Sequence, residues 1–343
     1  MQSDDSPTLF DAHADEDDSP ALPPGATEGE TEFAGIQGGL LPEPPPDFRS
    51  GFVGIVGRPN VGKSTLMNTL VGQKIAITSP IAQTTRNRLR GILTTPRAQI
   101  IFVDTPGIHK PHHELGKVIV QNARLAINSV DVLLFVVDGT VAAGRGDRFV
   151  ASLMEKNDTP VILGINKSDQ QPEDAAAIDE SYHTLAAEQN WQVQKFSALT
   201  GEGLEPLQER LVESLEPGPY YYPPDLVTDQ PERFIMGELI REQILQLTRE
   251  EVPHSVAIAI DRVTEKPDIT EVLATIHVER DSQKGILIGK KGSMIRDIGT
   301  AAREQIQKLI MGKVYLDLFV KVRPKWRQSR LYLSDLGYRV ETD

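Results

Sequence analysis

The segment from Gly57 to Ser64 has the residue types and spacing of a phosphate-binding loop, between a predicted strand and a predicted helix. Its glycines allow backbone N–H groups to close around phosphates, and the helix start adds its positive dipole end. We expect Lys63 to reach the β- and γ-phosphates and the Ser64 hydroxyl to ligate Mg²⁺. The residues predicted to bind nucleotide here are Gly57, Arg58, Pro59, Asn60, Val61, Gly62, Lys63, Ser64 and Thr65.

A second motif, Asp104-Thr105-Pro106-Gly107, begins 41 residues after Lys63. It follows a predicted buried strand, so Asp104 is expected to hold Mg²⁺ through water, and the Gly107 amide to sense the γ-phosphate. The tetrapeptide alone is equally typical of a type II turn. Its distance from the first motif favours the nucleotide site.

Two further motifs predict the base. Asn166-Lys167-Ser168-Asp169 ends another predicted strand, and the Asp169 carboxylate can accept guanine N1–H and the exocyclic amine, which adenine does not offer there. Ser197, Ala198 and Leu199 follow the last predicted strand and are expected to supply a backbone contact to guanine O6. The four motifs, in this order, predict GTP and GDP as ligands.

A switch that responds to the γ-phosphate needs a threonine between the first two motifs. Thr84 and Thr85 are the candidates, and we expect Thr85 to be the Mg²⁺ ligand, with Thr84 as the alternative. Together with Ser64 and Asp104 this completes the predicted metal site.

Hydrolysis is expected to be slow. Ile108 follows Gly107 where small GTPases place a glutamine that orients water, and isoleucine cannot do so. One hypothesis is that Asn60 helps to hold a monovalent cation, K⁺, near the phosphates; the alternative is that Asn60 only caps the loop. The expected catalytic residues are Lys63, Thr85, Gly107 and Asn60.

A different motif lies in the C-terminal third. Gly289-Lys290-Lys291-Gly292 is a G-x-x-G turn flanked by aliphatic residues, as in KH domains, where it clamps about four nucleotides of single-stranded nucleic acid. Lys290 and Lys291 are expected to meet phosphates. A second basic cluster includes Lys325 and Arg327, which we expect to extend the RNA surface; a solvated edge is the alternative.

The elements that position these motifs alternate between short apolar runs and amphipathic stretches. This pattern predicts an α/β P-loop GTPase domain, with a mostly parallel sheet and helices on both faces. The expected strands are 52–56, 88–93, 99–103, 132–137, 161–165 and 193–196, and the expected helices include 115–129, 147–156 and 174–189.

A Pro- and Tyr-rich stretch from Glu216 to Pro224 breaks both patterns and indicates a linker. Beyond it, a helix at 234–247, strands at 256–260 and 272–278, a Gly-rich turn, a helix near 293–311 and a strand at 314–322 predict an α+β domain. The expected division is a disordered acidic extension at 1–49, a GTPase domain at 50–217, a linker at 218–226, a type II KH domain at 227–337 and a tail at 338–343.

Charge is distributed unevenly along the 343 residues. The net charge is −13, but residues 1–49 hold twelve acidic side chains and one basic one, whereas residues 276–330 hold thirteen basic and five acidic ones. The chain has no cysteine, which excludes disulfides and thiolate metal sites. No uncharged apolar run approaches the ~18–20 residues of a membrane span.

The motifs together resemble those of the Era family of bacterial GTPases, over about residues 51–336. The matching segments are GRPNVGKS (57–64), QTTR (83–86), DTPG (104–107), NKSD (166–169), SAL (197–199) and GKKG (289–292). The resemblance implies a GTPase that acts in assembly of the small ribosomal subunit, binds near the 3′ end of small-subunit rRNA through its KH domain in the GTP state, and leaves after hydrolysis. It also implies a cytoplasmic protein with some inner-membrane association, and we expect a monomer.

Two details of that resemblance concern particular residues. The family has a hydrophobic residue in place of the catalytic glutamine, in agreement with Ile108, whereas the extension 1–49 departs from its pattern.

Two other functions remain: a constitutive RNA-binding protein with a relic G domain, which slow Lys63-dependent hydrolysis would exclude, and a membrane- or division-linked signalling GTPase with RNA as a secondary ligand. The latter predicts binding to anionic vesicles that survives mutation of Gly289 and Gly292.

Overall fold

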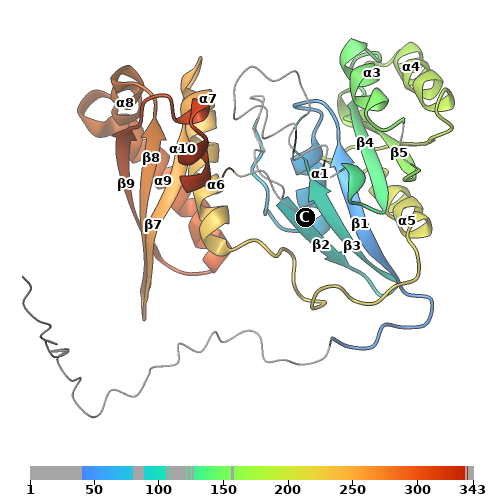
Figure 1. The fold of residues 1–343 in the computed structure, drawn as a ribbon, viewed down its shortest axis with the longest axis horizontal. Helices are drawn as coiled ribbons and strands as arrows, with labels where there is room; N and C mark the ends of the chain where they lie inside the picture. Colours follow the sequence, from blue (N-terminus) through green and yellow to red (C-terminus); the bar gives the residue numbers. More distant parts are fainter. Residues whose placement is uncertain are drawn as a thin grey trace, which may run out of the picture. The chain divides into compact units, whose positions relative to one another are not determined.

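The computed structural model describes residues 41–79, 89–105, 107, 121, 125, 127–155, 158–336 and 338. By contacts, the chain divides into Met1–Leu40 and Leu41–Asp343, and the second unit contains all of the described residues. The described residues form two β-sheets, one of six strands and one of three (Figure 1).

The six-stranded sheet has the order β2-β3-β1-β4-β5-β6. β2 runs antiparallel to β3, and the other neighbours are parallel, which confirms the predicted mostly parallel sheet. The strands are β1 (Arg49–Val56), β2 (Leu89–Thr94), β3 (Ala98–Asp104), β4 (Val132–Asp138), β5 (Val161–Asn166) and β6 (Gln192–Lys195).

Short apolar runs explain the central strands, such as residues 100–103 of β3 and 161–165 of β5. Every residue of β3 and of β5 is buried, as expected for parallel strands covered on both faces. All six strands lie where the sequence predicts them. β1 begins three residues earlier than expected, at Arg49, because its register with β3 starts at the pair Arg49 and Ala98.

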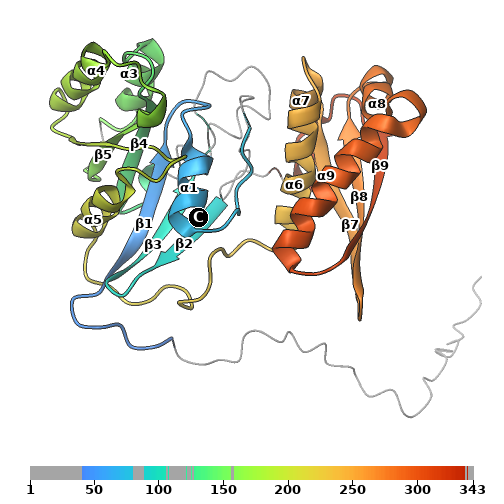
Figure 2. The same cartoon turned by 180° about the vertical axis from the view of Figure 1, so that it is seen from behind.

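Helices cover both faces of this sheet (Figures 1 and 2). One core contains residues of α1 and α5 against inward residues of β1 such as Val53; the other contains residues of α3 and α4 against residues of β4 such as Phe135. The helices are α1 (Lys63–Val71), α3 (Arg145–Ser152), η1 (Ser168–Gln170), α4 (Ala176–Ala187) and α5 (Leu204–Ser214). The helix predicted at 115–129 lies largely outside the described residues.

The sheet order places the candidate site. β1 lies between β3 and β4. From β1 the chain first forms β2 and β3 on one side and then β4 to β6 on the other, so the strand order reverses at the carboxyl end of β1. Ligands of open α/β sheets bind at such a point, outside the carboxyl ends of the strands. The segments after β1, β3, β5 and β6 carry the four predicted nucleotide motifs.

The three-stranded sheet has the order β7-β8-β9, with β7 antiparallel and β9 parallel to β8. α6 and α9 lie side by side against it (Figures 1 and 2). This confirms the predicted α+β fold. Its elements are α6 (Glu232–Leu247), α7 (Val252–Ser255), β7 (Ala257–Lys266), β8 (Ile269–Val278), α8 (Asp281–Ile288), η2 (Lys290–Gly292), α9 (Ser293–Ile310), β9 (Val314–Val322), η3 (Trp326–Gln328) and α10 (Arg330–Asp335).

One helix differs from the expectation. The sequence predicts a strand at 272–278, a Gly-rich turn and a helix, but the aliphatic residues before Gly289 form α8, so the G-x-x-G turn connects two helices. Gln283 starts α8 by accepting hydrogen bonds from the backbone N–H groups of Glu279 and Arg280. Leu287 is buried, whereas Ile286 is half exposed.

The Pro- and Tyr-rich stretch packs along the first sheet rather than standing away from it. The Gln99 side chain donates to the Tyr222 carbonyl at 2.9 Å, and the Ile92 N–H donates to the Val227 carbonyl at 2.8 Å. Across the described part of the chain, no helix has the length and apolar character that crossing a bilayer requires.

Candidate functional site

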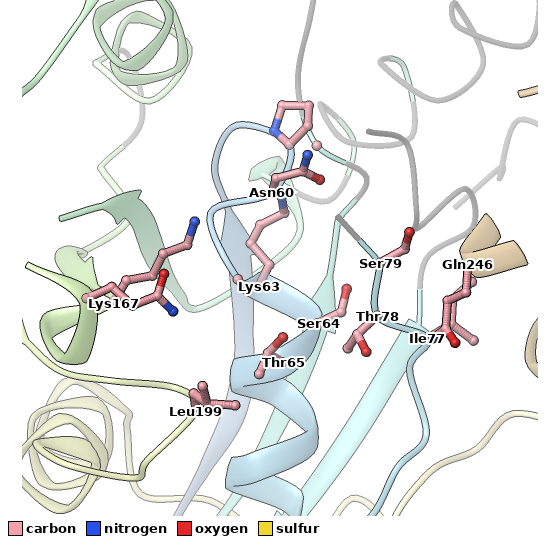
Figure 3. Close-up of a pocket in the computed structure, with 14 residues that line it drawn as sticks. Asn60, Lys63, Ser64, Thr65, Ile77, Thr78, Ser79, Lys167, Leu199 and Gln246 are labelled. Atoms are coloured by element: carbon pink, nitrogen blue, oxygen red, sulfur yellow. The ribbon is translucent and has the colours of Figure 1, made fainter. Parts of the chain in front are cut away.

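A pocket of about 640 Å³ opens around the loop between β1 and α1. Figure 3 shows Asn60 at the loop, Lys63 on the first turn of α1, and Lys167 beside them. The predicted site residues that line the pocket are Pro59, Asn60, Gly62, Lys63, Ser64, Thr65, Gly107, Lys167 and Leu199. The structure therefore brings all four predicted nucleotide segments to one place.

The glycines of the loop are required by close backbone packing. A Cβ at Gly57 would lie 2.3 Å from the Val136 carbonyl oxygen, and one at Gly62 would lie 2.2 Å from Nδ2 of Asn166. Gly62 also has a φ of 99°, which L side chains rarely adopt. Asn60 takes the left-handed conformation as well, with a φ of 64°, which asparagine tolerates better than most residues.

Lys63 is the first residue of α1 and is 6% exposed. Its ammonium donates to the carbonyls of Arg58, at 2.9 Å, and Gly57, at 3.3 Å. Burial lowers the pKa of Lys63 to about 8, against the opposing attraction of the Asp104 carboxylate. A phosphate group would replace the two carbonyls with a stronger partner for this cation.

Ser64, which lines the pocket, contacts Asp104. The Ser64 hydroxyl donates to Oδ2 of Asp104 at 2.7 Å, and Asp104 is fully buried at the end of β3. Hydroxyl and carboxylate oxygens are ligands that suit Mg²⁺. Thr105 donates its hydroxyl to the Ile55 carbonyl at 2.7 Å, and a Cβ at Gly107 would lie 2.7 Å from Cα of Pro59. Pro106, Thr84 and Thr85 lie outside the described residues.

Asn166 connects two of the predicted segments. Its Nδ2 donates to the Val61 carbonyl in the phosphate loop at 2.7 Å, and its Oδ1 accepts the Ala198 N–H at 2.8 Å. The residue is 2% exposed. Its side chain therefore fixes the distance between the phosphate loop and the segment expected to contact guanine.

Asp169, expected to read the base, contacts Ser197, which belongs to the segment expected to supply a backbone contact to guanine O6. The Ser197 hydroxyl donates to Oδ1 of Asp169 at 2.6 Å and accepts the Thr200 N–H at 3.1 Å. The Asp169 residue is exposed, so its second carboxylate oxygen is accessible from solvent. Leu199 is 70% exposed beside the pocket.

Two acidic residues near the site were not predicted from the sequence. Asp138, at the end of β4, forms an ion pair with Lys167 at 2.5 Å, and Asp147, on α3, forms one with Arg58 at 2.9 Å. Burial disfavours the charged form of Asp138, but hydrogen bonds from Lys167 and Thr140 prevail and lower its pKa. The position of Asp138 at a strand's carboxyl end is a signal the sequence analysis could have used; Asp147 has no such signal.

The G-x-x-G turn lies between α8 and α9. A Cβ at Gly289 would lie 2.7 Å from Cβ of Met294, so only glycine fits there. Gly292 has a φ of 76° and precedes α9, with open space where a Cβ would point. Lys290 and Lys291 are exposed. The turn therefore presents bare backbone and two cations at the start of a long helix.

The second basic cluster is less open than its composition suggests. Trp326 is fully buried, and its indole N–H donates to the Ser255 carbonyl at 2.9 Å. Arg327 is paired with Glu279, and its guanidinium also donates to the His254 carbonyl. Lys325 is exposed. Within this cluster, Lys325 presents its charge to solvent, while Arg327 stabilises the domain.

Two family models match the chain. One, described as "50S ribosome-binding GTPase", matches residues 52–167, and one described as "KH domain" matches residues 251–327. The first covers the phosphate loop and ends at Lys167, within the 166–169 segment, and the second covers the G-x-x-G turn. They agree with the two folds that carry these sites.

Relatives match over both halves. The chain is 77% identical over 301 residues to GTPase Era from Nostoc sp. (88% of this chain, 93% of the relative), and 72% identical over 302 residues to GTPase Era from Rippkaea orientalis (88% and 96%). A crystal structure of Era in complex with MgGDPNP and nucleotides 1506–1542 of 16S ribosomal RNA matches with a TM-score of 0.82 and 37% identity, covering 85% of this chain and 99% of that one. An Aquifex aeolicus Era variant bound to GDP and AlF4⁻ matches with a TM-score of 0.81 and 38% identity, over the same shares.

Proposed function

This chain belongs to the Era family of GTPases, and we propose that it is a GTP-timed RNA-binding switch in small ribosomal subunit assembly. It binds near the 3′ end of small-subunit rRNA in its GTP state and leaves after hydrolysis. The observation that carries the proposal is the presence, in one chain, of a four-segment nucleotide pocket and an exposed G-x-x-G turn. The related Era structure with MgGDPNP and a 16S rRNA fragment supports the same pairing.

The residues of the pocket have distinct roles in this function. Lys63 and the first N–H groups of α1 bind the β- and γ-phosphates and stabilise the charge that develops on them. Asp169 accepts the guanine N1–H and the exocyclic amine, the buried Ser197 hydroxyl orients that carboxylate, and the backbone of residues 197–199 contacts guanine O6. Gly107, whose backbone packs closely against Pro59, would sense the γ-phosphate through its amide.

Ser64 and Asp104 fit a magnesium ion, since they bring a hydroxyl and a buried carboxylate to the phosphate side of the pocket. When bound, Mg²⁺ neutralises charge on the phosphate oxygens. Ser64 would bind it directly and Asp104 through water, with Thr85 as the proposed third protein ligand. Hydrolysis proceeds slowly because Ile108 cannot orient the attacking water.

The K⁺ requirement is also part of the proposal. Asn60 is exposed, lines the pocket and has a left-handed backbone that turns the loop at its tip. Its side-chain oxygen would help to hold K⁺ near the phosphates and supply positive charge that other GTPases obtain from an arginine. GTP hydrolysis should be faster in KCl than in NaCl at equal ionic strength; equal rates would remove K⁺ from the mechanism.

Contacts within the described chain support coupling between the two functions. Glu242 on α6 is fully buried; it accepts the Thr78 N–H at 2.8 Å and pairs with Lys74 at 2.5 Å. Thr78 also lines the nucleotide pocket, as does Gln246 of α6. A change in the pocket at Thr78 therefore reaches the first helix of the RNA-binding fold through one hydrogen bond.

The KH fold supplies the RNA contact. Gly289 and Gly292 allow the RNA backbone to approach the turn closely, and Lys290 and Lys291 meet its phosphates. Lys325 extends this RNA-binding surface, and the neighbouring Arg327 contributes to it. The GTPase family model names the large subunit, but it covers residues 52–167 only, and RNA choice belongs to the KH fold.

We infer that the chain acts as a cytoplasmic monomer, where ribosomal subunits assemble, with peripheral association at the inner membrane. Cosedimentation with anionic vesicles tests the last point, and the Gly289 and Gly292 variants show whether RNA and membrane compete for one surface. The domain boundaries at residues 49, 217, 226 and 337 remain predictions that limited proteolysis can check.

Enzymatic activity gives the first test of this function. The purified chain should hydrolyse GTP slowly with Mg²⁺ present, and Lys63→Ala should abolish measurable turnover because the phosphates lose their principal cation. Asp104→Asn should make hydrolysis depend on higher Mg²⁺ concentrations. Turnover that persists undiminished in Lys63→Ala would place the activity elsewhere or in a contaminant.

A further inference from the structure

Arg58 belongs to the phosphate loop, but its side chain leaves the loop. The guanidinium reaches α3, where its Nε lies 2.9 Å from Oδ1 of Asp147, and Arg58 is not among the residues that line the nucleotide pocket. The alignment of the two groups is that of an ion pair rather than of a hydrogen bond. The side chain of Arg58 therefore has a structural partner outside the site to which its backbone belongs.

Asp147 is held firmly at its end of the pair. It lies in the first turn of α3, its side chain is 1% exposed, and its Oδ2 accepts the Gly144 N–H at 2.9 Å. Within the described part of the chain, Arg58 is the cation found within ion-pair distance of this carboxylate. A buried carboxylate without its cation is costly, so the pair restrains both partners.

The neighbouring contacts leave Arg58 little room to move. A Cβ at Gly146 would lie 2.7 Å from Cδ of Arg58, so the arginine stem packs against the α3 backbone. At the other end of the residue, the Arg58 carbonyl accepts the Lys63 ammonium at 2.9 Å. Arg58 thus links Asp147 to the lysine that binds phosphate.

We propose that Asp147 is a positioning residue for nucleotide binding: through the Arg58 side chain it anchors the phosphate loop, and with it the carbonyls that hold Lys63, to helix α3. Among the described residues, two contacts from predicted nucleotide motifs also support the loop: Asn166 at Val61 and Gly107 at Pro59. Asp147 is the third support and comes from outside those motifs. Because the loop is held from three sides, it is already ordered before the phosphates bind, and this order lowers the entropic cost of binding.

The inference rests on the nucleotide function proposed above, and the two can fail separately. Tight GDP binding by the native chain tests the function before any variant is compared. Asp147→Asn then tests the inference, since asparagine keeps an oxygen for the Gly144 N–H and removes only the charge. Arg148→Gln is the matched control, because it removes another α3 ion pair, with Glu188, that is half exposed and does not touch the loop.

The measurement is the dissociation rate of a fluorescent GDP analogue from the full-length chain, together with steady-state GTP hydrolysis and thermal unfolding. Asp147→Asn and Arg58→Gln should each raise the dissociation rate roughly tenfold and raise KM with little change in kcat, because the loss is of binding shared by ground and transition states. Arg58→Lys should restore part of the loss, and Arg148→Gln should behave as the native chain.

The double variant Asp147→Asn/Arg58→Gln leaves no unpaired buried charge, so it remains informative even where a single variant folds poorly. It should dissociate GDP no faster than the single variants, since all three lose the same contact. A folded double variant with the native dissociation rate would overturn the proposal. So would additive effects of the two substitutions, which would show that Arg58 and Asp147 act independently.

Discussion

The ammonium of Lys167 lies 2.5 Å from the carboxylate of Asp138, which ends the neighbouring strand β4. Lys167 belongs to the segment expected to select the base, and its backbone adopts a φ of 67°. Both side chains are mostly buried, with 24% of Lys167 and 18% of Asp138 exposed. This ion pair fixes the long, flexible side chain of Lys167 along the wall of the pocket before a nucleotide binds.

Asp138→Asn should weaken GDP binding about fivefold, since a partly exposed ion pair contributes up to about 1 kcal/mol. The reason is that Lys167 then samples orientations that do not line the pocket. Titration calorimetry measures the change. Glu271→Gln, which removes the exposed pair with Lys266 in the β7–β8 hairpin, is the control and should leave GDP affinity unaltered. A native-like affinity in Asp138→Asn would show that Lys167 needs no anchor.

Nucleotide affinity should depend on pH through Lys63. Its pKa is about 8 in the free protein and rises when phosphate becomes its partner, so the bound state holds the proton more tightly. Affinity should therefore be constant below pH 7 to 7.5 and fall as pH rises through about 8, by up to tenfold per pH unit. Binding near pH 8 should take up protons, which calorimetry in buffers of different ionisation enthalpy detects.

Lys63→Arg provides the comparison for this pH profile. Arginine stays charged throughout the range, so the variant should bind GDP more weakly but lose the decline between pH 7.5 and 9. If the native chain and Lys63→Arg decline equally, another group is responsible for the dependence.

Gly292→Asp should abolish RNA binding and leave GTP hydrolysis without RNA intact. The glycine has a φ of 76°, which aspartate adopts only with strain, and a carboxylate there would repel the phosphates expected beside Lys290 and Lys291. Fluorescence anisotropy with a single-stranded RNA measures binding. Gly285→Ala on α8, where a methyl group meets nothing, is the matched control and should bind RNA normally. RNA binding that survives in Gly292→Asp would move the interface away from the turn.

Glu242→Gln should reduce the communication between the pocket and α6. Glutamine can still accept the Thr78 N–H but lacks the charge that pairs with Lys74. The link between the pocket and α6 therefore becomes weaker, and the substitution leaves no unpaired carboxylate buried. The ratio of RNA affinities in the GTP and GDP states should move toward one, while GDP affinity changes little. Glu304→Gln, an exposed acid on α9, should keep the native ratio. An unchanged ratio in Glu242→Gln would place the coupling elsewhere.

The parts of the fold predicted best are those fixed by local pattern. β3 and β5 are built around the apolar runs 100–103 and 161–165, which a strand covered on both faces can bury, and α6 has apolar residues at helical spacing from Phe234 to Leu247. Helix α8 was not predicted, because its aliphatic residues were interpreted as flanks of the G-x-x-G turn. Its start depends on one capping contact, from Gln283.

The residues of the site also differ in how far the sequence predicts their positions. Lys63, Ser64 and Asp104 follow predicted strands, and the parallel pairing of β1 with β3 brings Ser64 and Asp104 together. Asp147 contacts Arg58 across a separation of 89 positions, and no sequence pattern relates the two. Trp326 stands between basic residues in the sequence, and only the packing against Ser255 and Tyr338 shows that it belongs to a core.

The central claim is that the γ-phosphate controls RNA affinity. The most direct measurement is binding of the purified chain to an oligonucleotide that copies the 3′ end of small-subunit rRNA, with a non-hydrolysable GTP analogue and with GDP, at one fixed salt concentration. We expect tighter binding with the analogue and loss of binding in Gly292→Asp for both nucleotides. Equal affinity in the two nucleotide states would contradict the claim, since a switch can act only through a difference in affinity between its states.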